Sequence, residues 1–173
     1  MRVVGIDPGF SGALACIDPV TDEVIGLEDM PTGYSGDVKV VCPLSIYGLL
    51  KRWQPDVIIL EKVGPRHTDK RSSMWKFAQG YGAVIAACQL YANRPSLHLV
   101  APGVWKVPFG LILGAGVTDA DKKRASLEMA RQIFPDVAGE QLKRQMDDGR
   151  AEALLVAAYY QRALAAADEM EVI

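Results

Sequence analysis

The stretch Val57-Ile58-Ile59-Leu60-Glu61, residues 57–61, gives the clearest strand signal in the chain. Four branched aliphatic residues after Pro55-Asp56 are typical of a strand that is buried on both faces. A carboxylate at the end of such a strand is costly unless it is paired, solvated at a cleft or bound to a metal. The pattern therefore predicts a central strand that brings Glu61 to a functional edge. An ordinary solvated acid is the alternative.

The amino-terminal residues repeat this pattern. The apolar run 3–7 ends on Asp7 and is followed by Pro8-Gly9, which closes it in a turn. Two more strands are expected over residues 13–17 and 23–27, in an antiparallel meander with the first. Residues 31–43 contain Pro, Gly, Ser and Asp, and they are predicted to form a loop.

The remaining elements alternate along the chain. Helices are predicted over residues 44–53, 72–91, 118–134 and 148–167, a basic loop over 64–71, a mobile segment over 110–116 and a fifth strand over 97–101. Thr118 is the expected N-cap of its helix, with Asp121 at the N3 position. The chain begins with three strands, and helices and strands alternate after them. This order predicts an α/β fold with a mixed five-stranded sheet flanked by helices, in one domain over residues 1–173.

Composition excludes several classes of protein. Half of the 173 residues are hydrophobic, which excludes global disorder, and the formal net charge of −2 excludes a polybasic protein. Three cysteines (Cys16, Cys42 and Cys88) and two histidines make a disulfide framework and a zinc site unexpected. The chain has no apolar run of the roughly 20 residues that span a bilayer and no signal-peptide pattern. We expect a cytoplasmic protein, in a bacterium or encoded by a phage inside its host, without a membrane partner.

A third acidic group lies near the carboxyl end. Asp148 and Glu152 are four residues apart, so they share one face of a predicted helix, where like charges repel unless a cation lies between them. A solvated first turn is the alternative, because acids suit that end of a helix. The small neighbours Ala151 and Ala153 favour packing against a sheet.

Carboxylate oxygens are the ligands that Mg²⁺ prefers. The predicted catalytic and metal-binding residues are therefore Asp7, Glu61, Asp148 and Glu152. Such a set can form a two-metal site, in which one ion generates the attacking hydroxide and the other stabilises the leaving oxygen.

Three motifs, at residues 4–9, 59–61 and 148–155, together resemble those of RuvC-like Holliday junction resolvases, most closely the phage-type branch. Similar stretches also occur at residues 72–77, 80–82, 102–106 and 121–123, so that the resemblance covers nearly the whole chain. It implies an RNase H-like fold, a homodimer and Mg²⁺-dependent nicking of branched DNA, such as four-way junctions, in recombination and replication. Mn²⁺ is expected to replace Mg²⁺, with two ions per site.

The sequence departs from the family at one position. Familiar bacterial members place the last two acids three apart, and this chain has Gly149 there. We carry the role to Asp148, since it shares a helix face with Glu152, and Asp147 is the alternative.

Basic residues favour a nucleic-acid partner. The segment 62–76 has a local net charge of +4 from Lys62, Arg66, Lys70, Arg71 and Lys76 against Asp69. Further phosphate-binding candidates are Lys106, Lys122, Lys123, Lys143, Arg144 and Arg150. Trp75 and Phe77 are predicted to stack on unpaired bases or wedge between them, and burial of Trp75 in the core or a dimer interface is the alternative. Gly80 and Gly82 favour close helix packing across a two-fold axis.

Two other functions are compatible with parts of this pattern. Residues 7–12 also resemble the first phosphate loop of actin-like ATPases and sugar kinases, but those enzymes duplicate the domain and need a longer chain. A non-catalytic DNA-binding module with the same fold is the second alternative. The four acids argue against it, because a protein without catalysis would be expected to lose at least one of them.

Overall fold

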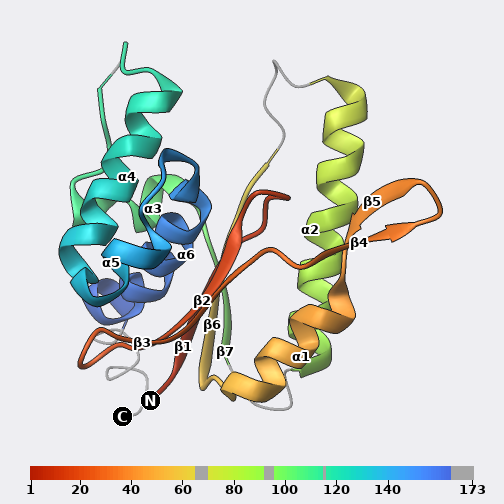
Figure 1. The fold of residues 1–173 in the computed structure, drawn as a ribbon, viewed down its shortest axis with the longest axis horizontal. Coiled ribbons are helices and arrows are strands. Elements are labelled where there is room, and N and C mark those ends of the chain that lie inside the picture. Colours follow the sequence, from red (N-terminus) through yellow and green to blue (C-terminus); the bar gives the residue numbers. More distant parts are fainter. Residues whose placement is uncertain (65–69, 92–95, 115, 165–173) are drawn as a thin grey trace.

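A five-stranded sheet lies between two layers of helices (Figure 1). The computed structural model describes residues 1–64, 70–91, 96–114 and 116–164. The strands are β1 (Val3–Asp7), β2 (Ala13–Asp18), β3 (Glu23–Asp29), β6 (Val57–Glu61) and β7 (Ser96–Val100), in the order β3-β2-β1-β6-β7. The first three pair antiparallel, whereas β1, β6 and β7 are parallel. The predicted mixed sheet and its meander are confirmed.

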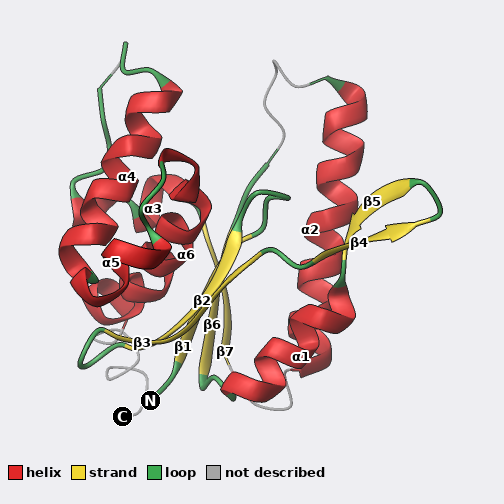
Figure 2. Cartoon of the chain, in the orientation of Figure 1, coloured by secondary structure: helices red, strands yellow, loops and turns green. Residues whose placement is uncertain are grey.

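Helices cover both faces of the sheet (Figure 2). On one face lie α1 (Pro43–Trp53) and α2 (Arg71–Tyr91). On the other lie α3 (Pro102–Trp105), α4 (Asp119–Ile133), α5 (Pro135–Gln141) and α6 (Asp148–Tyr159). Short 3-10 turns span Val107–Phe109 and Gln145–Asp147, and a π-helical turn, Tyr160–Leu164, continues α6.

The apolar core divides into two clusters, one on each face. Ile58 and Leu60 of β6 contribute to the cluster beneath α1 and α2, whereas Ile59 contributes to the cluster beneath α4 and α6. Strands that are covered by helices on both sides read as continuous apolar runs, which explains the sequence of β6.

Glycines allow α6 to lie directly on the sheet. A Cβ atom at Gly5 in β1 would collide with the backbone of Ala153 and Ala157 in α6. At the start of α6, a Cβ at Gly149 would collide with the Ser11 carbonyl in the loop after β1. The first turns of α6 are therefore fixed beside the carboxyl end of β1.

Residues 31–43, predicted to be a loop, contain a hairpin of β4 (Thr32–Ser35) and β5 (Val38–Val41). The hairpin projects from the body of the protein, so it lacks the alternating apolar pattern of a half-buried strand (Figure 1). Its turn contains Gly36 with a positive φ of 59°. The hairpin is held by a contact with another element, because Val41 of β5 packs against Gly80 of α2.

The helix predictions hold within the described residues, and the structure adds the short helices α3 and α5. The Thr118 hydroxyl accepts a hydrogen bond from the Asp121 N–H at 3.1 Å, so the predicted N-cap of α4 is confirmed. After α4 the chain forms α5 rather than ending its helices at Pro135, since proline is tolerated in a first helical turn. The predicted helix 148–167 extends beyond the described residues. No helix in the described part of the chain is long and apolar enough to span a bilayer.

Candidate active site

The parallel strands β1 and β6 end at the same edge of the sheet. Ile6 is the partner of Leu60 in the register, so Asp7 and Glu61 follow side by side. The start of α6 lies against the loop after β1, with Asp148 in its first turn and Glu152 one turn later. The charges of Glu61, Glu152 and Asp148 all act on Asp7, so the structure brings the four predicted acids together.

Asp7 is the most strongly perturbed member of this acidic cluster. Burial, followed by the negative charges of Glu61, Glu152 and Asp148, raises its pKa from 3.8 to about 7. The Gly9 N–H donates a hydrogen bond to Asp7 Oδ1 at 3.2 Å and opposes the rise only in part. Asp7 is half-buried, whereas Glu61 is buried, with 5% exposure. The cluster therefore favours the arrival of positive charge.

Two lysines supply positive charge to the cluster. Lys106 Nζ lies 2.8 Å from Glu152 Oε1, and Lys123 Nζ lies 2.6 Å from Asp148 Oδ2. The hydrogen bond to Asp148 raises the pKa of Lys123. Both lysines were predicted to bind DNA, and in this structure both are paired with the predicted catalytic acids.

Two residues that the sequence analysis did not assign hold the acids in place. The Trp105 indole Nε1–H donates a hydrogen bond to Glu61 Oε1 at 3.0 Å, inside the core. The buried Ser126 hydroxyl donates to Glu152 Oε1 at 3.1 Å. The polar hydroxyl of Ser126 in an otherwise apolar helix stripe was the available signal for the role of Ser126.

Asp147 is held away from the cluster. It is 3% exposed, and its carboxylate accepts hydrogen bonds from the Arg144 backbone N–H at 2.7 Å and from the Arg144 guanidinium at 2.8 and 3.0 Å. Burial alone would raise its pKa, but these bonds outweigh it and lower the pKa. An acid at position 149 would collide with Ser11. The structure thus places Asp148 with Asp7 and Glu152, although the catalytic role of each acid stays a prediction.

The described residues of the predicted basic segment lie directly after β6 and in the first turns of α2. Its described basic residues are all exposed: Lys62, Lys70, Arg71 and Lys76. Arg66 lies outside the described residues. Trp75 is 68% exposed, so the alternative that it belongs to the core of the chain is wrong.

The remaining basic candidates are engaged within the chain to different degrees. Arg150 forms a two-pronged ion pair with Asp29 at 2.6 and 2.9 Å, which ties α6 to β3. Lys122 lies 3.3 Å from Asp119 on the surface of α4. The guanidinium of Arg150 is therefore already used in holding the fold, whereas Lys122 pairs only at the surface.

Two of the four acids in the cluster are paired with lysines. Among residues 1–64, 70–91, 96–114 and 116–164, no three acidic, histidine or cysteine side chains are grouped closely enough to hold a metal. Lys106, Lys123 and Trp105 each bond to one carboxylate of the cluster.

No family model and no curated protein matches the sequence. Three solved structures are similar to the fold. RuvC of Thermus thermophilus in complex with a Holliday junction substrate has a TM-score of 0.61 and 17% identity, over 94% of this chain and 96% of that chain. Another T. thermophilus RuvC structure has a TM-score of 0.52 and 19% identity, and it also covers 94% of this chain and 96% of that chain. The yeast mitochondrial Holliday junction resolvase Ydc2 has a TM-score of 0.51 and 16% identity, over 93% of this chain and 78% of that chain. The chain therefore has the RNase H-like fold of RuvC.

Proposed function

We propose that the chain is a structure-specific endodeoxyribonuclease that hydrolyses phosphodiester bonds in branched DNA, with the four-way Holliday junction as its main substrate. The observation that carries this proposal is the half-buried Asp7 carboxyl, gathered with Glu61, Asp148 and Glu152 at one edge of the sheet. Ydc2 is described as a Holliday junction resolvase, and one of the similar RuvC structures holds such a junction. We further propose a role in recombination and replication.

The donor set fits a hard divalent cation, and we propose Mg²⁺, with Mn²⁺ as a substitute. Four carboxylates provide the oxygen ligands that such ions take, and the pKa of Asp7 is raised first by burial and then by the charges of the other three acids. Two bound ions would supply Lewis-acid activation of water and of the phosphate. Lys106 and Lys123 must release Glu152 and Asp148 before these carboxylates can bind an ion, and Trp105 keeps Glu61 oriented meanwhile.

Competition between lysine and metal can be measured without cleavage. Removal of one ammonium group, in Lys123→Ala, frees Asp148 and should enlarge the rise in melting temperature that Mg²⁺ causes over EDTA. For the wild type, linkage predicts about 2.7 kcal/mol of stabilisation at 100 times the dissociation constant. Lys143→Ala, which changes an exposed lysine, is the matched control. The same Mg²⁺ shift in both variants would contradict a metal site at Asp148.

The activity itself is tested on a synthetic four-way junction, a flap and a plain duplex. We expect Mg²⁺-dependent cuts in the junction, none in EDTA, and a loss of cleavage but not of binding in Asp7→Asn. An ATP hydrolysis assay on the same samples tests the actin-like alternative. A wild-type protein that binds the junction and never cuts it, with either metal, would support the non-catalytic module instead.

We also propose a homodimer that uses the exposed face of α2. Gly82 and Ala86 are exposed one turn apart on this helix, and a Cβ at Gly82 meets no described atom within 4 Å. Gly80, predicted to lie in the interface, instead faces Val41 and Phe10 of its own chain, so that part of the expectation is wrong. A four-way junction is approximately two-fold symmetric, and a C2 dimer would present two matching sites.

A further inference from the structure

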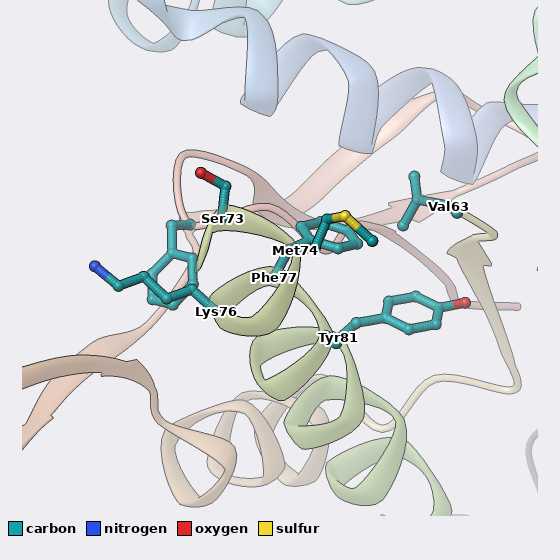
Figure 3. A pocket seen from close by; sticks show the side chains of 9 residues that line it. Val63, Ser73, Met74, Lys76, Phe77 and Tyr81 are labelled. Carbon is teal, nitrogen blue, oxygen red and sulfur yellow. The ribbon is translucent and has the colours of Figure 1, made fainter. Parts of the chain in front are cut away.

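A cavity of about 630 Å³ lies between the first turns of α2, the loop after β1 and the segment after β6. Its walls include Phe10, Val63, Met74, Lys76, Phe77 and Tyr81. Figure 3 shows Tyr81 and Val63 at one end and Ser73 and Lys76 at the other, with Met74 and Phe77 between them. The volume lies within the range of sites that hold small organic groups.

The cavity adjoins the acidic cluster. Val63 follows Glu61 by two residues, and Phe10 follows Asp7 by three. Burial, and after it the charge of Glu61, raises the pKa of the Tyr81 phenol, which shows that this ring lies within electrostatic reach of the carboxylate. A group bound in the cavity would therefore sit beside the bond that the acids are proposed to cut.

The lining has the chemistry of a surface on which a flat ring stacks. The rings of Phe77 and Tyr81 are nearly parallel, at 14°, with centroids 6.1 Å apart, and Phe10 and Met74 add further apolar contact. Tyr81 Oη is buried and has no hydrogen-bond partner within the described residues. A buried hydroxyl without a partner is costly, and an acceptor on a bound ring would remove that cost.

Positive charge lies at the rim. Lys76 points its ammonium group away from the rings in Figure 3, and it also lines an adjoining cavity of about 460 Å³. That second cavity is bounded by Phe10 and by Tyr34, Asp37 and Lys39 of the β4–β5 hairpin. The exposed Lys39 and Lys76 would meet phosphate groups on either side of a nucleotide, whereas Asp37 contributes one opposing charge.

We infer that the cavity receives a single unpaired nucleobase of the DNA substrate, extruded next to the phosphate that is cut. The base stacks on Phe77 and Phe10, the Tyr81 hydroxyl donates a hydrogen bond to one of its acceptors, and Lys76 faces the neighbouring phosphate. Unpaired bases at a branch point are the least costly to extrude. The inference rests on the proposed function, and it makes this pocket the origin of any preference for sequence at the cut.

The test asks whether the effect of each pocket variant depends on the presence of one particular base. Binding is measured in the Asp7→Asn background, on intact junctions and on junctions with an abasic nucleotide at each position flanking the cut. Phe77→Ala should weaken binding to the intact junction about tenfold, and this loss should vanish when the base that fills the pocket is absent. Tyr81→Phe should show a smaller loss with the same dependence on that base. Tyr91→Phe, which removes a hydroxyl further along α2, is the matched control and should show none.

Each outcome decides the assignment. If the pocket variants lose the same binding affinity for intact and abasic junctions at every position, the base-binding proposal is wrong. The proposed nuclease function is then unaffected, provided that the wild type still cuts. The proposal is also wrong if the binding loss of Phe77→Ala depends on the base and that of Tyr81→Phe does not. A base wedged outside the pocket would give this result, because it would not reach the Tyr81 hydroxyl. Variants that sediment as monomers while the wild type is a dimer would assign the cavity to a second copy of the chain. A wild type that neither binds nor cuts branched DNA overturns both proposals. If Phe77→Ala lowers the melting temperature, Phe77→Leu replaces it.

Discussion

Asp7 carries much of the electrostatic cost of the acidic cluster. Its folded pKa of about 7 lies well above the ordinary value of 3.8, so the folded protein binds a proton there that the unfolded chain has already released. Stability without metal must therefore fall as the pH rises from about 4 to about 7, and then level off. The full shift corresponds to a penalty of about 4 kcal/mol.

Asp7→Asn should remove this penalty. In EDTA at pH 8 we expect the variant to melt at a higher temperature than the wild type, and we expect the difference to disappear below about pH 4. The asparagine carbonyl can still accept the hydrogen bond from Gly9, so the turn is kept. Thermal melts over this pH range measure the effect. Identical melting temperatures at pH 8 would mean that Asp7 is a solvated turn residue.

The neighbouring acids Asp147 and Asp148 should respond in opposite ways. Asp147→Asn weakens the bonds between the buried Asp147 carboxylate and the exposed Arg144, and it should cost about 2 kcal/mol of stability while the folded fraction still cleaves DNA. Asp148→Asn should change stability little, because Lys123 is largely exposed, but it should abolish cleavage. Urea unfolding and single-turnover cleavage separate the two effects. A greater loss of cleavage in Asp147→Asn would return the role to that residue.

Sequence reasoning selected Asp7 and Glu61 because each ends an apolar run, and it selected Asp148 and Glu152 by their helical spacing. Both are local signals. Sequence reasoning did not find Trp105, whose partner Glu61 is 44 residues away. An indole that packs in a core and an indole that donates to a carboxylate look the same in a sequence. The pairing of Lys106 and Lys123 with the acids was missed for the same reason, since only the folded chain places them there.

Gly5 and α6 show how packing between elements sets the geometry of the site. Gly5→Ala would press a methyl group into the backbone of α6, which cannot move without separating Glu152 from Asp7. We expect the free energy of unfolding to fall by about 3 kcal/mol or more, and cleavage to be lost. Gly48→Ala is the control, because Gly48 lies in α1 with open space around it and should gain up to about 1 kcal/mol. Equal stabilities in urea would contradict the close contact.

The elements that were predicted correctly are those with a strong local period or cap. β6 has its apolar run and α4 has the Thr118 cap, so each is visible without its neighbours. The β4–β5 hairpin was missed because Tyr34 is 76% exposed and its strands bury too little to impose alternation. The short helices α3 and α5 both begin at prolines, which read as breaks.

The proposed dimer places the exposed face of α2 at a two-fold axis. Gly82→Glu would place two like charges near a two-fold axis, and it should convert a dimer to a monomer at micromolar concentration. Gly48→Glu, on the exposed side of α1, is the matched control and should remain a dimer. Sedimentation of the free proteins and of their junction complexes measures this. A wild type that is monomeric in both states would contradict the dimer.

The backbone contact between α6 and β1 also determines how the protein responds to thermal fluctuation. Asp148 and Glu152 cannot part from Asp7 by local fraying, because such a movement would have to open the central core. Amide protons of β1 and α6 should therefore exchange with solvent only through global unfolding. The β4–β5 hairpin and the start of α2 are exposed, and they can open at little cost. One side of the protein can thus adapt to differently shaped DNA while the acids keep a constant spacing.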